Sequence, residues 1–147
     1  MSHSDWLSNV FKPSELRKAA RGIAKQIKFD RANGIHINAI AVTGLSGLTF
    51  GTVLSYMTGL RLIALRKTDY SHSSYTIEYD DYRIGYAYCI VDDLIASGDT
   101  MNRIIRNMTG ENDAFHCEKI YLYHPSSSSD VFIDDTGNKI PVYPYPG

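Results

Sequence analysis

Two adjacent carboxylates followed by a run of small polar residues could carry chemistry in this sequence. Asp92 and Asp93 end an apolar run, and the next loop contains Ala96, Ser97, Gly98, Asp99 and Thr100. A helical pattern starts directly after Thr100, so backbone amides and two hydroxyls would lie at a helix N-terminus, which favours an anion. The carboxylates would accept hydrogen bonds from vicinal hydroxyls, directly or through a metal ion and its water. This spacing suits a ribose 5-phosphate.

A structural role is the alternative for the same residues. Asp92 and Asp93 would then be turn acids, and Asp99 would be a helix cap. Adjacent carboxylates at a buried strand end repel each other, so that role needs a compensating interaction.

Two further groups are candidates for binding phosphate, and a third candidate, a histidine, lies in residues 68–74, which have no periodicity and are expected to form a mobile loop. Gly44, Leu45, Ser46 and Gly47 form a glycine-rich turn between a strand and a helix. Arg66 and Lys67 end the next apolar strand, and arginine suits bidentate contact with phosphate. His72 is the only histidine, lysine or arginine in residues 68–82. The alternatives are a structural turn, two solvated charges and an exposed loop histidine.

The elements that must position these residues follow from apolar periodicity. Residues 13–27 predict an amphipathic helix with one apolar stripe, followed by a polar connector at 29–36. Strands are expected at 37–43, 60–65, 75–79, 85–91 and 119–123, with helices at 48–57 and from Met101 to Met108. Residues 131–133 and 140–142 flank a turn and predict a hairpin. The alternation predicts an α/β fold with a mostly parallel central sheet flanked by helices, whose ligands bind at the carboxyl ends of the strands.

The stretch Ile90-Val-Asp-Asp-Leu-Ile-Ala-Ser-Gly-Asp-Thr100 resembles the 5-phosphoribosyl 1-pyrophosphate (PRPP) motif of type I phosphoribosyltransferases. The resemblance implies that Asp92 and Asp93 contact the ribose hydroxyls, and hold Mg²⁺ through water, while residues 96–100 bind the 5′-phosphate. Residues 40–51 and the pair Arg66-Lys67 look most like adenine phosphoribosyltransferases, which implies that residues 44–47 and this pair bind pyrophosphate. It also implies a non-proline cis peptide at or beside Ser46.

By the same resemblance the protein is an enzyme. It would transfer ribose 5-phosphate from PRPP to a nitrogenous base, with a purine favoured, and release pyrophosphate. Three departures from the family pattern stand out. Asp99 replaces the usual glycine, Ser46 stands where adenine and orotate relatives have Arg or Lys, and residues 68–82 hold no Lys or Arg. These departures favour a second hypothesis, a regulatory protein that binds PRPP or a nucleoside monophosphate without turnover. An unrelated flavodoxin-like α/β domain is the third.

Composition sets the remaining expectations. The 147 residues predict one domain, with an N-terminal helix and connector at 1–36 and a tail or base-covering hood at 125–147. The net charge of −1 gives no support to a nucleic-acid or membrane partner. No apolar stretch is long enough for a membrane span, which predicts a cytosolic protein. The resemblance implies a homodimer, for which the tyrosines at 70, 75, 79, 82, 86 and 88 would offer surface.

Overall fold

A computed structural model describes residue 8 and residues 11–67, 75–80, 87–124 and 129–143, with the backbone alone described at Lys67 and Tyr75. Within these residues the helices are α2 (Pro13–Ala32), α3 (Gly44–Thr58) and α4 (Asp99–Glu111). The strands are β1 (Ala39–Thr43), β2 (Arg61–Lys67), β3 (Tyr75–Glu78), β4 (Ala87–Asp92), β5 (His116–Leu122), β6 (Val131–Ile133) and β7 (Lys139–Tyr143).

The strands form one sheet in the order β3-β2-β1-β4-β5-β7-β6. The five inner strands are parallel, and β3 and β6 are antiparallel to their neighbours at the two edges. The predicted α/β class with a mostly parallel sheet is confirmed. The predicted hairpin is present as β6 and β7, but it also extends the central sheet because β7 pairs with β5.

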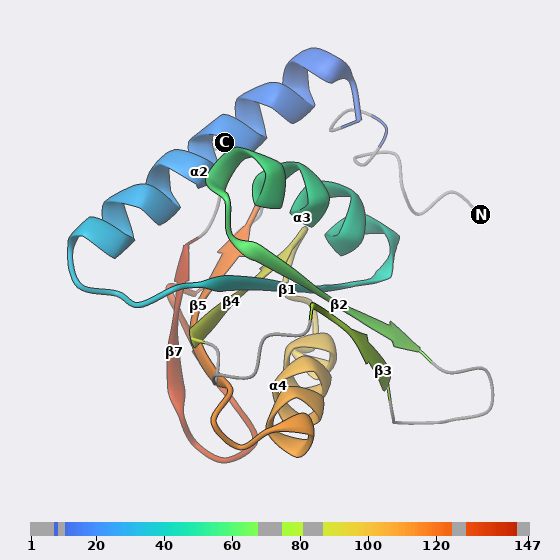
Figure 1. The fold of residues 1–147 in the computed structure, drawn as a ribbon, viewed down its shortest axis with the longest axis vertical. Helices are drawn as coiled ribbons and strands as arrows, with labels where there is room; N and C mark the ends of the chain where they lie inside the picture. The colour runs from blue at the N-terminus through green and yellow to red at the C-terminus, as the bar shows by residue number, and fades with distance from the viewer. Residues whose placement is uncertain (1–7, 9–10, 68–74, 81–86, 125–128, 144–147) are drawn as a thin grey trace.

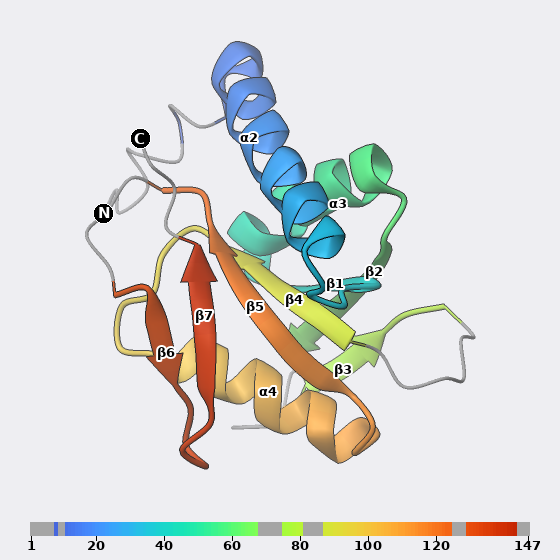
Figure 2. The ribbon, with the colours of Figure 1, turned by 90° about the vertical axis from the view of Figure 1, so that its left-hand side faces the viewer.

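Helices cover both faces of the sheet (Figure 1). Figure 2 shows α2 and α3 on one side of the strands and α4 on the other, with β6 and β7 at one edge. Ile23 of α2 and Phe50 of α3 are buried in one core, and Met101 and Ile104 of α4 in the other. Alternate residues of β1 and β4 point into the two cores, which explains why both strands are apolar runs without polar alternation. No helix in the described ranges is both long and apolar enough to cross a membrane.

The first helix is longer than its sequence pattern predicts. Residues 29–32, expected in the connector, form the last turn of α2. The reason is Asp30, whose buried carboxylate accepts hydrogen bonds from Tyr121 Oη at 2.6 Å and Lys119 Nζ at 2.7 Å. These contacts hold the final turn against β5. Gly34, at φ 94°, then takes the left-handed conformation that commonly follows a helix end.

The glycine-rich segment after β1 also differs from expectation, because α3 begins at Gly44 and not near Leu48. Residues 44–47 are therefore the first helical turn and not a separate loop. A Cβ atom at Gly47 would lie 3.3 Å from Val42 Cβ, and one at Gly51 would lie 2.6 Å from Val42 Cγ1. These two glycines let the helix pack closely on β1. The spacing of the glycines in the sequence could not distinguish this packing role from phosphate binding.

Candidate functional site

A pocket of about 270 Å³ lies at the carboxyl ends of β1 and β4. It joins two of the segments predicted to bind phosphate, although they are separated by some fifty residues of sequence. The start of α3 contributes Gly44 and Ser46, and the end of β4 contributes Asp92 and Asp93. The loop into α4 contributes the remaining predicted residues that line it: Ala96, Ser97, Gly98 and Thr100.

The two carboxylates are held by hydrogen bonds from backbone and side chain. Asp92 Oδ1 accepts from the Asp93 amide at 2.8 Å and from the Ser46 hydroxyl at 3.2 Å. Asp93 Oδ1 accepts from the Leu94 amide at 2.7 Å. Asp92 is buried and Asp93 is half-buried, so both carboxylates lie in an environment with limited access to water.

This environment makes the negative charge on Asp92 costly. Burial, together with the negative charge of Asp93, raises the pKa of Asp92 from its ordinary value of 3.8 to about 7. Hydrogen bonds from the Asp93 amide and the Ser46 hydroxyl oppose this increase in pKa. A cation or hydroxyl donor bound between the two carboxylates would relieve the repulsion, because both favour the charged form.

The loop after the carboxylates turns into a helix at Gly98. Gly98 has φ 89°, and α4 begins at the next residue. The Asp99 amide donates to Ser97 Oγ at 3.2 Å, and the Gly98 carbonyl accepts from the Asn102 amide at 3.0 Å. The first amides of a helix have no acceptor within it, so the amides of Thr100 and Met101 are the donors that an anion in this pocket would use.

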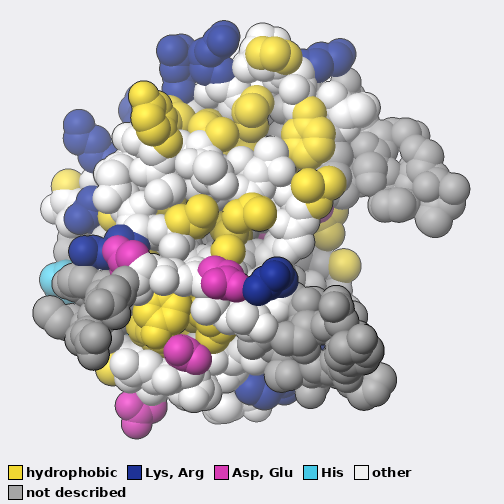
Figure 3. All heavy atoms as spheres, turned by 45° about the vertical axis from the view of Figure 1, so that its right-hand side comes forward, with side chains coloured by type: hydrophobic (Ala, Val, Ile, Leu, Met, Phe, Trp, Pro, Cys, Tyr) yellow, Lys and Arg dark blue, Asp and Glu magenta, His cyan; other side chains and the backbone are white. Residues whose placement is uncertain are grey.

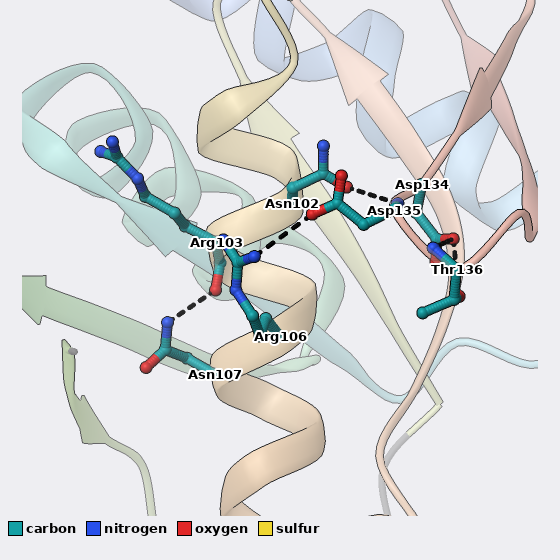
Figure 4. A network of polar contacts seen from close by, with 7 residues as sticks. All are labelled: Asn102, Arg103, Arg106, Asn107, Asp134, Asp135 and Thr136. Carbon is teal, nitrogen blue, oxygen red and sulfur yellow. Dashed lines mark hydrogen bonds and ion pairs between the residues drawn. The ribbon is translucent and has the colours of Figure 1, made fainter. Parts of the chain in front are cut away.

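The C-terminal hairpin supports this loop from behind. A Cβ atom at position 98 would lie 2.9 Å from Cε1 of Phe132 in β6, so the aromatic ring lies directly against Gly98. The hairpin is also attached to α4 (Figure 4): the Asp135 amide donates to Asn102 Oδ1 at 2.9 Å, and the Asp135 carboxylate pairs with Arg106 at 3.2 Å. Sequence reasoning missed Phe132 and Asp135 because both lie far along the chain from the loop.

Sequence reasoning also missed Tyr123, whose contacts fix the start of α3. Tyr123, directly after β5, donates from Oη to the Ser46 carbonyl at 2.9 Å. Its ring stacks on Phe50 with centroids 4.1 Å apart and an angle of 7° between the planes. Ser46 is thus held from two sides, by Tyr123 through its carbonyl and by Asp92 through its hydroxyl.

Several predicted site residues lie away from the pocket lining. Arg66 Nη2 pairs with Glu78 Oε2 at 2.6 Å on the exposed edge formed by β2 and β3. The side chain of Leu45 is exposed, and Gly47 packs on Val42. Asp99 is exposed and does not line the pocket. Of Lys67 only the backbone in β2 is described, and His72 lies outside the described residues.

The expected cis peptide at or beside Ser46 is wrong. Every peptide bond in the described part of the chain is trans, including those of residues 43–47. The physical reason is that these residues form the first turn of α3, and a regular helix requires trans peptides.

Comparison with known proteins gives sequence similarity to one group of enzymes, although no family model matches. An adenine phosphoribosyltransferase from Marinobacter nauticus is 31% identical over 98 residues, which cover 55% of this chain and 54% of the relative. One from Francisella tularensis subsp. holarctica is 30% identical over 102 residues, covering 60% and 57%. The matches thus span just over half the length of these curated relatives.

Comparison with solved structures identifies the fold of this chain. Adenine phosphoribosyltransferase from Saccharomyces cerevisiae superimposes with a TM-score of 0.64 over 91% of this chain and 80% of its own, at 16% identity. The UMP synthase of Leishmania donovani superimposes with a TM-score of 0.61 over 77% of this chain and 23% of its own, at 23% identity. The chain therefore has the type I phosphoribosyltransferase fold and resembles the adenine phosphoribosyltransferases in sequence.

Proposed function

We propose that this protein binds PRPP with Mg²⁺ and transfers ribose 5-phosphate to a nitrogenous base, with a purine favoured. The observation that carries the proposal is the pocket that joins Asp92 and Asp93 to the N-terminus of α4 and to the start of α3. Acceptors for a diol and donors for a phosphate meet there within one small volume. The sequence similarity to adenine phosphoribosyltransferases supports the choice of a purine.

In the proposed reaction a base nitrogen attacks C1 of the ribose. The bond between C1 and the pyrophosphate oxygen breaks, a C–N bond forms, and pyrophosphate leaves. The proton of the attacking nitrogen passes to pyrophosphate or to solvent. No residue needs to form a covalent intermediate. The loop of residues 96–100 would hold the 5′-phosphate at the N-terminus of α4, and Asp92 and Asp93 would hold the ribose hydroxyls and orient C1. The first turn of α3 would direct its amides, beside Ser46, towards the leaving pyrophosphate.

The donor set of the pocket fits Mg²⁺. Two carboxylates supply the hard oxygen atoms that Mg²⁺ prefers, and its waters can occupy the rest of its coordination sphere. A divalent cation beside them would also offset the repulsion that raises the pKa of Asp92. When bound, Mg²⁺ would neutralise charge on the leaving pyrophosphate.

A protein that binds PRPP without turnover is the second candidate. The lack of Lys and Arg in the lining of the described pocket favours it. Arg66, proposed to contact pyrophosphate, instead pairs with Glu78. In the catalytic case, this ion pair must open when PRPP binds. Both side chains of the pair are largely exposed, so opening it costs about 1 kcal/mol or less.

One experiment separates the two candidates. The protein is incubated with PRPP, Mg²⁺ and one base at a time, and released pyrophosphate is measured beside calorimetric binding of PRPP. Turnover with adenine or another purine supports the enzyme, and binding without turnover supports the second candidate. Absence of both contradicts the proposed site. The variant Asp92→Asn/Asp93→Asn should lose binding, whereas the charge-matched variant Asp113→Asn/Asp130→Asn, at two exposed positions, should keep it.

We also propose that residues 1–147 form one domain and that two copies associate. The support for a homodimer is an apolar outer face of α3, where Leu45 is 73% exposed, Leu48 is 43% exposed and Tyr56 is 91% exposed. Tyr88, expected on the surface, is buried in β4, so it offers no contact area. Light scattering at micromolar concentration should give the mass of a dimer, and a monomer mass would contradict the proposal.

A further inference from the structure

The positive charge of this protein is concentrated on one helix. α2 holds six of the 15 Lys and Arg residues and two carboxylates, which gives it a formal charge of +4. The rest of the chain holds nine Lys and Arg against fourteen carboxylates and carries −5. One of the two carboxylates of α2, Asp30, is buried against Lys119, so Glu15 is the only acid that the helix exposes. The net charge of −1 therefore conceals a strongly basic surface.

The six cations share one face of the helix. At 3.6 residues per turn, their positions fall within an arc of about 140° and extend over about 21 Å along the axis. The opposite face is buried in the core through Ala20, Ile23 and Ile27. Figure 3 shows Lys and Arg side chains along the upper margin of the molecule, where α2 runs in Figure 1. We name this face the α2 basic face; it consists of Arg17, Lys18, Arg21, Lys25, Lys28 and Arg31.

The α2 basic face has no acidic partner among the described residues. All six side chains are exposed, and none is within ion-pair distance of a described carboxylate. Of the seven other cations with described side chains, four pair with carboxylates: Arg61, Arg66, Arg106 and Lys119. Unpaired cations on one helix face repel one another, and a bound polyanion would remove that repulsion.

Apolar surface lies directly beside these charges. A groove of about 440 Å³ runs between α2 and the end of α3, lined by Lys25, Lys28 and Arg31 together with Met57 and Thr58. Phe29 is 60% exposed and lies one turn after Lys25 on the same side of the helix. Exposed aromatic rings beside a row of cations are the elements that bind single-stranded nucleic acids, because bases stack on the rings while cations follow the phosphates.

We propose that the α2 basic face and its groove bind single-stranded nucleic acid. The cations contact successive phosphates, and an unpaired base stacks on Phe29 or enters the groove beside Met57. A duplex keeps its bases stacked inside the helix and cannot use Phe29 in this way. A membrane is a weaker fit, because an amphipathic helix binds lipid through its apolar face and that face of α2 is buried in the core.

The test is fluorescence anisotropy with a labelled oligouridylate of about 16 nucleotides. We expect micromolar affinity at about 50 mM salt, with a steep loss towards 200 mM. The variant Lys25→Gln/Lys28→Gln should bind at least tenfold more weakly, and its salt slope should fall by about 1.4, for two lost phosphate contacts. Phe29→Ala should lose about fivefold or more in affinity with an unchanged salt slope, because it removes stacking and no charge.

The control variant Arg103→Gln/Lys139→Gln removes the same charge from α4 and β7 and should bind the oligonucleotide as the wild type does. PRPP binding should be unchanged in all three variants, so this proposal and the proposed function can fail separately. The proposal is overturned by absence of binding at low salt or by equal losses in both charge variants. It is also overturned if the protein binds duplex and single strand equally and Phe29→Ala leaves the affinity unchanged. Binding to phosphatidylserine vesicles without binding to RNA would overturn it too.

Discussion

The Ser46 hydroxyl donates a hydrogen bond to Asp92 Oδ1 over 3.2 Å, joining two segments that are 46 residues apart in sequence. This bond connects the first turn of α3 to the end of β4. It places the proposed pyrophosphate end of the pocket beside the proposed ribose end. It also stabilises the charged form of a carboxylate that burial makes costly, because the hydrogen bond from Ser46 opposes the increase in the pKa of Asp92.

Replacement of both carboxylates should separate binding from stability. Each charged hydrogen bond to a ribose hydroxyl contributes about 1.5–3 kcal/mol. Asp92→Asn/Asp93→Asn should therefore weaken binding of Mg²⁺ and PRPP about 100-fold or more. The melting temperature should stay the same or rise, because two repelling charges are removed. Calorimetric titration beside a thermal melt measures both. A lower melting temperature with unchanged affinity would mean that the two acids only shape a turn.

The raised pKa of Asp92 predicts an unusual pH dependence of stability. The folded state keeps a proton on Asp92 up to about pH 7, whereas the unfolded state loses it near 3.8. Between these values the folded state binds more protons, so the contribution of Asp92 to stability falls as the pH rises. Asp92→Asn cannot lose a proton there. Its melting temperature relative to the wild type should therefore be higher at pH 8 than at pH 5, measured in EDTA. A constant difference would contradict the raised pKa.

Gly98 should tolerate no side chain, for two separable reasons. Alanine would be strained at φ 89° by about 1–2 kcal/mol, and its Cβ would collide with Phe132. Gly98→Ala should therefore lower the free energy of unfolding by about 2 kcal/mol or more and abolish phosphate binding. In a Phe132→Ala background, the same change should cost only the backbone strain. Urea unfolding of the four proteins tests this, and equal costs in both backgrounds would show that the ring contact has no influence.

Asn102 should link the hairpin to the phosphate loop. Asn102→Ala removes the acceptor of the Asp135 amide and should lower the free energy of unfolding by about 1 kcal/mol. PRPP affinity should fall several-fold as the loop loses this support. Asn107→Ala is the matched control: it lies in the same helix, gains the same helix propensity and loses a hydrogen bond to the Arg103 carbonyl within that helix. Equal affinity losses in both variants would contradict the role of Asn102.

Local pattern predicted most of the fold. The centres of β1, β2, β4 and β5 and the hairpin of β6 and β7 lie where apolar runs and turn residues indicated them. The errors occur where a distant residue decides the outcome. The last turn of α2 depends on the contact of Asp30 with Tyr121, and the early start of α3 is held by Tyr123, which donates to the Ser46 carbonyl. Neither partner is visible to a reading of neighbouring residues.

The sequence by itself determined that Asp92, Asp93 and the loop into α4 lie together, because residues so close along a chain must also be close in space. It also determined the spacing of the cations on α2, which helical geometry converts into one face. The tertiary structure alone decided that Ser46 meets Asp92, that Phe132 lies against Gly98 and that Arg66 pairs with Glu78. These contacts depend on the order and register of strands, which arise from packing across the whole sheet and leave no periodic pattern in the chain.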